Sequence, residues 1–362
     1  MPARTDKIKV LIVDDSAIVR QILSNSLASH EDIEVVGTAP DPYIARDKIL
    51  TLKPDVVTLD IEMPRMNGLT FLKKLSEYHP LPVIIISSRT QSSCETALEA
   101  LRLGAVHVLA KPGGPYSVGD LQIDLPHYVR AAAAAGSRIL DRARVSAPPA
   151  ASLPKLAIPP SDFLVAIGAS TGGTEAIQQI LTQLPETTPP LVIVQHIPAS
   201  FSTAFARRLH QLCKFEVREA ENGDLLRPGL ALVAPGDFHL VVRRCGAHLR
   251  AFVKQGPRVC YQRPSVDVLF ESVASAAGAS SLGLLLTGMG VDGARGLLKM
   301  KQAGAHTIAQ DEASSVVFGM PRTAIESGAA CEVLPLSRMA LRILQICEQK
   351  ARSASPKSKP GS

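Results

Sequence analysis

Short apolar runs alternate with helical patterns along most of this chain, and each of the main runs ends at a polar side chain. In the first part of the chain the runs cover 9–13, 56–59, 83–86 and 106–110, and the helical patterns cover 17–29, 42–52, 68–78 and 93–103. Strands that alternate with helices at this spacing predict a parallel, doubly wound α/β sheet. Because ligands bind at the carboxyl ends of the strands in such sheets, the polar residues there are candidate site residues.

The four runs of the first part end at acidic, hydroxyl and basic residues, namely Asp14 and Asp15, Asp60, Ser87 and Lys111. Three carboxylates brought together repel one another unless a cation lies among them, and hard oxygen ligands suit Mg²⁺. A carboxylate beside Mg²⁺ can attack a phosphoryl group, whose oxygens a lysine and a hydroxyl would hold. One such aspartate alone would be read equally well as a helix cap, but the complete set favours a phosphoryl site.

The second part repeats the pattern, with apolar runs at 163–167, 191–194 and 282–286 that end near Ser170, His196 and Asp292. Helical patterns at 174–184, 201–213, 266–277 and 294–302 predict a second parallel α/β sheet. The segments 230–235, 240–243 and 248–253 are interpreted as an antiparallel excursion.

A serine, a histidine and an aspartate at three strand ends form the set that nucleophilic catalysis requires. Each has another interpretation by itself: a glycine-rich phosphate turn at Ser170, a core histidine at His196, and a cap of the following helix at Asp292. The spacing Gly168-x-Ser170-x-Gly172 fits a nucleophile elbow, yet the order Ser, His, Asp differs from that of α/β-hydrolases, so that fold is not predicted.

The formal net charge of +6 does not indicate a nucleic-acid-binding domain, because the basic excess is concentrated in 126–160 and 351–362. The six cysteines form no CxxC pair, which favours reduced thiols. The N-terminus lacks a signal-peptide pattern and no apolar stretch is long enough to span a membrane, so we expect a cytoplasmic protein without membrane insertion.

Residues 7–125 resemble the receiver domain of two-component response regulators, through the motifs LIVDDS, LDIEMPRMNG and AKP. The resemblance implies a flavodoxin-like fold and phosphorylation of Asp60 by a histidine kinase. It also implies phosphoryl contacts from Ser87 and Lys111, and Mg²⁺ held by the following groups: Asp14, Asp15, Asp60 and the backbone carbonyl of Glu62.

Residues 161–350 resemble the catalytic domain of the chemotaxis protein-glutamate methylesterases, through IGASTGGTEAI, QHIP, RPSVDVLF, LTGMGVDGA and VFGMPR. The resemblance implies a Rossmann-like domain whose triad is Ser170, His196 and Asp292. Its substrates would be methylated glutamates, and also glutamines, of chemoreceptor signalling helices. We expect the backbone amides of Thr171 and Met289 to bind the oxyanion, and no cofactor in this site.

Between the two domains, residues 126–160 combine a helical, basic segment with a proline- and alanine-rich stretch, which predicts a linker. Residues 351–362 are expected to form a disordered tail. A receiver attached to a hydrolase suggests that the unphosphorylated receiver blocks the triad. Three other classes remain as alternatives: a nucleic-acid-binding response regulator, a non-catalytic scaffold and an NAD-dependent oxidoreductase.

Overall fold

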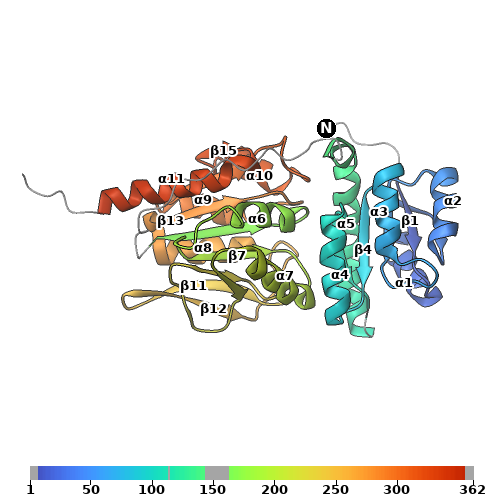
Figure 1. Cartoon of the computed structure of the whole chain (residues 1–362), viewed down its shortest axis with the longest axis horizontal. Helices are drawn as coiled ribbons and strands as arrows, with labels where there is room; N and C mark the ends of the chain where they lie inside the picture. The colour runs from blue at the N-terminus through green and yellow to red at the C-terminus, as the bar shows by residue number, and fades with distance from the viewer. Residues whose placement is uncertain (1–6, 113–114, 143–162, 355–362) are drawn as a thin grey trace, which may run out of the picture. The chain divides into compact units, whose positions relative to one another are not determined.

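The computed structural model describes residues 7–112, 115–142 and 163–354. The chain divides into two compact units, within residues 1–148 and 149–362. Each unit is built on a parallel β-sheet packed against helices (Figure 1). The predicted α/β class, with two parallel-sheet units, is confirmed.

The first unit contains a sheet with the strand order β2-β1-β3-β4-β5, in which every neighbouring pair is parallel. Its elements are β1 (Ile8–Val13), α1 (Ala17–Ala28), β2 (Ile33–Ala39), α2 (Pro42–Leu52), β3 (Val56–Asp60), α3 (Gly68–Tyr78), β4 (Val83–Ser87), α4 (Gln91–Arg102), β5 (His107–Ala110) and α5 (Pro115–Arg142). The sequence analysis did not identify β2. This edge strand is only half buried along most of its length, so it lacks the continuous apolar run of β3 and β4.

Helix α5 differs from the helix expected at the start of the linker. It begins at Pro115, accommodates Pro126 in its interior, and contacts α1 and β5 of the first unit. Its alanines Ala131, Ala132 and Ala135 are fully buried, which explains why small side chains recur there: they allow close packing. The part of the predicted linker from 143 to 160 lies outside the described residues.

The second unit has a sheet with the order β15-β14-β13-β6-β7-β10-β8 and a smaller sheet with the order β11-β12-β9. Its elements are β6 (Leu164–Ala169), α6 (Gly173–Leu181), β7 (Leu191–Gln195), α7 (Ala199–Leu212), β8 (Glu216–Glu219), β9 (Asp224–Leu225), β10 (Leu230–Val233), β11 (His239–Cys245), β12 (His248–Lys254), α8 (Val266–Ala277), β13 (Ser281–Leu285), α9 (Ala294–Gln302), β14 (His306–Gln310), α10 (Met320–Glu326), β15 (Glu332–Leu334) and α11 (Leu336–Ala354).

The antiparallel excursion was predicted correctly only in part. β11 and β12 pair in antiparallel fashion, but the segment 230–235 contains β10, which is parallel to both β7 and β8 in the main sheet. β10 is buried along its whole length because it is an interior strand. Its four residues are too few to distinguish a parallel core strand from an antiparallel one by pattern alone.

Both sheets reverse their winding direction at a point where a site can form. In the first unit the chain passes from β1 outward to β2 and then to β3 on the other side. In the second unit it passes from β6 to β7 in one direction, and from β13 to β14 in the other. Ligands of open α/β sheets bind in the crevice at such switch points. The predicted site residues follow β1 and β3 in one unit, and β6 and β13 in the other.

The C-terminal helix α11 continues to Ala354, into the stretch that was expected to be a disordered tail, while residues 355–362 lie outside the described part of the chain. The apolar face of α11 explains its order, since Ile343, Leu344 and Cys347 are buried. Among the described helices, none combines the length and apolar character needed to cross a membrane.

Candidate functional site

The structure brings Ser170, His196 and Asp292 to the carboxyl ends of three neighbouring strands, β6, β7 and β13 respectively. The backbone amide of Ser170 donates to the carbonyl of Thr287 in the loop after β13, at 3.0 Å. The amide of His196 donates to the carbonyl of Ala169 at 3.1 Å. These bonds fix the serine turn between the histidine strand and the aspartate loop. All three site side chains are buried.

His196 and Asp292 form a direct hydrogen bond, with 2.9 Å between Nε2 and Oδ2. Because the Asp292 carboxylate is held ionised, Nε2 carries the proton and Nδ1 keeps its lone pair. His196 Nδ1 and Ser170 Oγ are both buried atoms that have no hydrogen-bond partner. Buried polar atoms without a hydrogen-bond partner lower the stability of the fold. When a folded protein retains them, a catalytic or ligand-binding role is one explanation. The imidazole is therefore oriented with Nδ1 as the available base.

Four donors surround the carboxylate of Asp292. Besides His196, the hydroxyl of Ser265 and the amide of Asp267 donate to Oδ1 at 2.8 and 3.0 Å, and the amide of Val266 donates to Oδ2 at 2.7 Å. These last three lie at the N-terminus of α8, where the helix dipole favours an anion. Burial favours the neutral form, but the bonds from His196 and from these amides outweigh it and hold the pKa of Asp292 below its ordinary value.

Asp267, in the first turn of α8, in turn accepts hydrogen bonds from the start of α9. Its Oδ1 accepts from the amides of Gly293 and Gly296 at the start of α9, at 3.0 and 2.7 Å. The N-cap residue of α9 is Gly293, which supplies no side-chain bond. The interpretation of Asp292 as a cap of the following helix is thus wrong in detail: it caps α8, and Asp267 caps α9.

Glycines and buried amides shape the turn around Ser170. A Cβ on Gly288 would lie 2.7 Å from Ser170 Cβ, and Gly172 has φ +76°, so both turns need glycine. Gln195 Nε2 donates to the carbonyl of Ser170 at 2.8 Å. Thr287 Oγ1 donates to the carbonyl of Thr171 at 2.9 Å. The sequence analysis missed both of these residues, although Gln195 occupies a strand end just as His196 does.

The amides of Thr171 and Met289 follow Ser170 and Gly288 directly, on the two turns that meet here. In the described part of the chain, no backbone carbonyl accepts a hydrogen bond from either amide. Such unpaired amides beside a serine are suited to bind a negatively charged oxygen.

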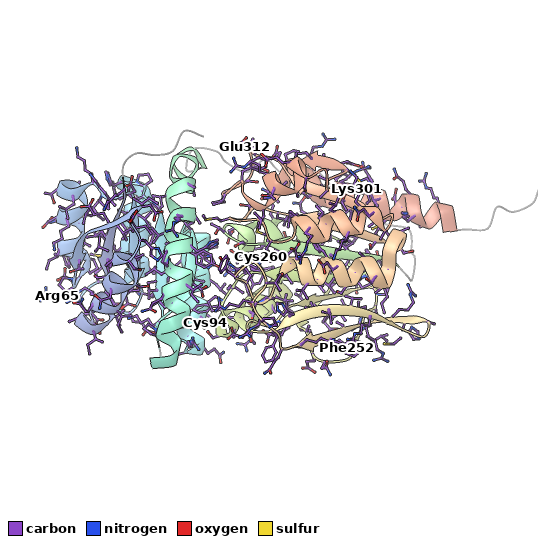
Figure 2. The ribbon with its side chains drawn as sticks, turned by 180° about the vertical axis from the view of Figure 1, so that it is seen from behind. Arg65, Cys94, Phe252, Cys260, Lys301 and Glu312 are labelled. Atoms are coloured by element: carbon purple, nitrogen blue, oxygen red, sulfur yellow. The ribbon has the colours of Figure 1, made fainter. Side chains whose placement is uncertain are left out.

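Cys260, Asp267 and Asp292 place a thiol and two carboxylates within 4.8 Å of one another, close enough for metal ligands. Cys260 is labelled in Figure 2. Asp292 and Asp267 are already engaged as acceptors of helix amides, so the cluster is explained by the caps. Burial is the main cause that raises the pKa of the Cys260 thiol, which favours its protonated form.

In the first unit, Asp14 and Asp60 are fully buried and share Lys111. Lys111 Nζ lies 2.7 Å from Asp60 Oδ2 and 3.1 Å from Asp14 Oδ2. Burial raises the pKa of Asp60 to about 6 and also raises the pKa of Asp14, while the lysine offsets part of this effect. The single positive charge of Lys111 is therefore too small to balance the charges of the two buried carboxylates.

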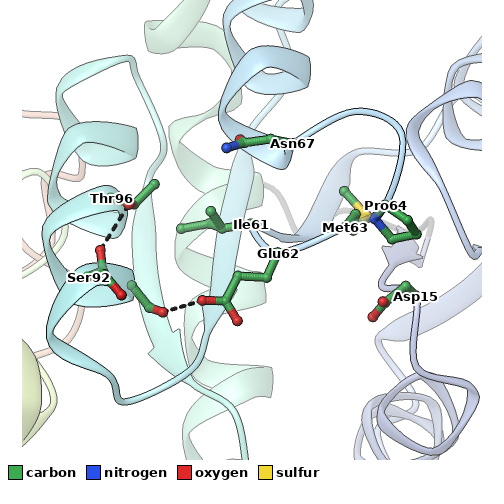
Figure 3. A pocket seen from close by; sticks show the side chains of 9 residues that line it. Asp15, Ile61, Glu62, Met63, Pro64, Asn67, Ser92 and Thr96 are labelled. Atoms are coloured by element: carbon green, nitrogen blue, oxygen red, sulfur yellow. Dashed lines mark hydrogen bonds between the residues drawn. The ribbon is translucent and has the colours of Figure 1, made fainter.

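The donor set of this site fits a divalent cation. Oxygens of Asp14, Asp15 and Asp60 lie within 4.8 Å of one another, and the buried Asp14 Oδ2 lies 3.1 Å from Lys111 Nζ without a hydrogen bond of good geometry. Asp15 and Glu62 border a cavity of about 360 Å³ that opens beside them (Figure 3). Hard carboxylate oxygens at an accessible cavity are suited to Mg²⁺, which retains several waters.

Ser87 lies at the end of β4, and its hydroxyl donates to the carbonyl of Ser93 at 3.4 Å. Ser93 in turn donates to the Glu62 carboxylate. Arg20 donates to the carbonyls of Asp14 and Asp15 at 2.6 and 3.0 Å. Sequence reasoning missed Ser93 and Arg20, because neither follows a strand.

Comparisons with known proteins agree with this architecture. Residues 10–118 match the response regulator receiver domain family, and residues 165–343 match the CheB methylesterase family. The chain is 52% identical, over 94% of its length and 99% of the relative's, to protein-glutamate methylesterase/protein-glutamine glutaminase 2 of Syntrophus aciditrophicus. It is 49% identical, over 93% of its length and 96% of the relative's, to the protein-glutamate methylesterase/protein-glutamine glutaminase of Escherichia coli.

Among solved structures, the Thermotoga maritima CheB methylesterase catalytic domain is similar with a TM-score of 0.50 and 37% identity, covering 51% of this chain and 99% of that one. The family matches cover both units, and the relatives match along nearly their whole length. The chain therefore belongs to the protein-glutamate methylesterase/protein-glutamine glutaminase family, in which a response regulator receiver domain precedes a CheB methylesterase domain.

Proposed function

We propose that this chain hydrolyses methyl esters of glutamate side chains in chemoreceptors, and deamidates glutamines there, with Ser170 as nucleophile, His196 as base and Asp292 as orienting acid. The observation that carries this proposal is the bond from His196 Nε2 to Asp292, which leaves Nδ1 and Ser170 Oγ as unpaired buried atoms. A serine hydroxyl is hardly ionised at neutral pH, so it needs such a base.

The reaction proceeds through an acyl-enzyme. Ser170 Oγ bonds to the ester carbonyl carbon while its proton passes to His196 Nδ1. The developing oxyanion accepts from the amides of Thr171 and Met289, and loss of one such donor typically costs on the order of 10²–10³ in rate. The carbonyl reforms, and methanol leaves with the proton from Nδ1, or ammonia leaves when the substrate is a glutamine. Water then attacks the acyl-enzyme with His196 as base, which releases glutamate and restores Ser170.

Asp292 supports both steps. Its ionised carboxylate fixes the tautomer of His196 and stabilises the imidazolium that forms when Nδ1 takes the proton. In chymotrypsin-type triads it is Nδ1 that faces the acid, so the ring nitrogens have exchanged roles in this arrangement. The helix amides around Asp292 keep it ionised in a buried position.

Asp60 is the proposed acceptor of a phosphoryl group from a histidine kinase of the chemotaxis type. Lys111 contacts Asp60 already and would hold a phosphoryl oxygen, and Ser87 would turn its hydroxyl toward the same group. Bound Mg²⁺ would neutralise charge on the phosphoryl oxygens during transfer. Asp14, Asp15, Asp60 and the backbone carbonyl of Glu62 are the groups proposed to hold it.

Phosphorylation would release a restraint that the receiver places on the hydrolase. We propose domain boundaries of 7–125 for the receiver, 126–160 for the linker and 161–350 for the methylesterase domain. The phosphorelay and the receptor signalling helices would place this reaction in the cytoplasm, without nucleic acid as a partner.

A serine-directed fluorophosphonate tests the triad directly. We expect it to label Ser170, as mapped by mass spectrometry, and to label the His196→Ala protein far more slowly. Labelling of the His196→Ala protein at the original rate, or at another serine, would contradict the assignment.

A further inference from the structure

A tight hairpin lies next to the residues that surround Asp292. Val259 and Gln262 exchange two backbone hydrogen bonds, of 3.0 and 2.9 Å, and between them Cys260 and Tyr261 form a two-residue turn. These four residues are called the 259–262 hairpin. The two central residues have φ values of +50° and +65°. A turn with both values positive usually contains asparagine and glycine, so a cysteine and a bulky tyrosine are held here under strain.

The two central side chains of the hairpin point to different environments. Cys260 Sγ lies 4.0 Å from Asp267 Oδ2, and the same thiol belongs to the group of atoms within 4.8 Å that includes the Asp292 carboxylate. Tyr261 is 72% exposed, although tyrosine is large and mostly apolar. The hairpin therefore rests on the residues that hold the triad acid and presents an aromatic ring to solvent.

A further contact holds the backbone of the hairpin. Arg258 Nη1 donates to the carbonyl of Tyr261 at 3.1 Å. Ser265, just beyond the hairpin, donates to Asp292. On the other side of Asp292, Val291 is 55% exposed. One exposed apolar side chain thus belongs to the hairpin whose Cys260 thiol lies near Asp292, and the other directly precedes Asp292 in the loop after β13.

Strained backbone conformations and exposed aromatic residues both concentrate at functional surfaces. Folding alone does not require a tyrosine at this position, because its side chain is largely unburied. The substrate of the proposed reaction is a side chain of a protein, and Ser170 is only 1% exposed. A protein segment whose glutamate ester reaches Ser170 must contact the protein surface around the site.

We propose that the 259–262 hairpin docks the protein segment that carries the methylated glutamate, with Tyr261 packed against apolar side chains next to the ester. This inference rests on the proposed function of Ser170, His196 and Asp292. Tyrosine is enriched among the interface residues that provide a large share of binding energy, because its ring buries much area with little loss of conformational freedom. Tyr261 is then a specificity-determining residue that affects substrate binding and not the chemical step.

The test uses the full-length protein, activated with a small phosphodonor, and two readouts. One is methanol release from methylated receptor in membranes as a function of receptor concentration, and the other is the rate of fluorophosphonate labelling of Ser170. Tyr261→Gly removes the ring and relieves the positive φ, so strain cannot unfold this variant. Tyr261→Phe retains the ring, and Tyr78→Ala removes a comparable ring, 77% exposed, from the first unit.

We expect Tyr261→Gly to raise KM for the methylated receptor by about 5- to 30-fold, the loss expected when an interface residue that contributes to binding is truncated, with kcat and the labelling rate unchanged. Tyr261→Phe and Tyr78→Ala should retain the original KM. An unchanged KM in Tyr261→Gly would overturn the proposal, and so would a parallel loss of kcat and labelling, which would show that the hairpin supports the triad instead. Failure to label Ser170 in the unaltered protein would overturn the proposed function itself, and the docking proposal with it.

Discussion

Asp292 and Asp267 cap each other's helices. Asp292 precedes α9 but accepts from the amides of Val266 and Asp267 at the start of α8, and Asp267 accepts from the amides of Gly293 and Gly296 at the start of α9. This exchange ties two packed helices together at the carboxyl end of β13. It also places the acid of the proposed triad on a rigid support, because the amides that hold Asp292 lie at the start of helix α8.

Removal of the Asp267 carboxylate should therefore loosen Asp292. We expect Asp267→Ala to lower the free energy of unfolding by about 1–2 kcal/mol, the usual cost of a lost cap, and to lower kcat for methanol release. Asp41→Ala is a matched control, since Asp41 caps α2 in the first unit through the amides of Tyr43 and Ile44. Denaturant unfolding should show a similar loss in both variants. Equal kcat values for the two would argue against a positioning role for Asp267.

The acid of the triad can be tested without a change of shape. Asp292→Asn retains the size of the side chain but cannot fix the same tautomer of His196, so we expect kcat to fall by up to about 10⁴, as in other triads. Asp237→Asn, at an exposed aspartate of the same unit, serves as the control. A fall in kcat of similar size in both variants would indicate general damage and not the loss of the orienting acid.

The raised pKa of Asp60 predicts a pH dependence of stability in the first unit. The pKa is about 6 in the folded state against 3.8 for the ordinary group, so the folded state binds more protons between these values. Stability is therefore highest below pH 3.8 as far as this group is concerned, and it is lost as pH rises through 6, by at most about 3 kcal/mol.

Thermal unfolding of a 1–148 fragment in the presence of EDTA can measure this loss. Asp60→Asn should flatten the profile between pH 4 and 7, since asparagine does not ionise. Added Mg²⁺ should restore stability at pH 7 in the unaltered fragment, because the cation compensates the buried negative charge. If the stability of the Asp60→Asn fragment depends on pH in the same way as that of the unaltered fragment, Asp60 is not the titrating group.

The sequence predicts much of this architecture because buried parallel strands and the sites at their ends leave a strong pattern. β3, β4, β6, β7 and β13 are buried along their whole length, and Ser170, His196 and Asp292 follow three of them. The edge strands β2 and β15 lack such runs, since solvent covers one side of them. The direction of β10 depends on its partners β7 and β8 and not on its own four residues.

The roles of single atoms were not accessible from the sequence. Only the folded structure shows that Asp292 caps α8, and that Nε2 and not Nδ1 of His196 faces it. The pattern Ser265-Val266-Asp267 does signal a helix start, with a hydroxyl cap and an acid in the first turn. It does not reveal that the hydroxyl and the amides share a carboxylate from a loop some distance along the chain.

The receiver is expected to restrain the hydrolase until Asp60 is phosphorylated. Removal of residues 1–160 should then raise methanol release in the absence of a phosphodonor, and added phosphodonor should have no further effect. If the truncated protein is no faster than the unphosphorylated full-length chain, the receiver activates the hydrolase by some route other than the relief of inhibition.

The central claim is that Ser170 carries out a hydrolysis that phosphorylation of Asp60 switches on. Methanol release from methylated receptor, with and without a phosphodonor, measures both halves of this claim in the unaltered protein and in Ser170→Ala. The account predicts that the phosphodonor increases release by the unaltered protein, and that Ser170→Ala releases no methanol while Asp60 is still phosphorylated. Methanol release by a phosphorylated Ser170→Ala protein at the original rate would contradict it.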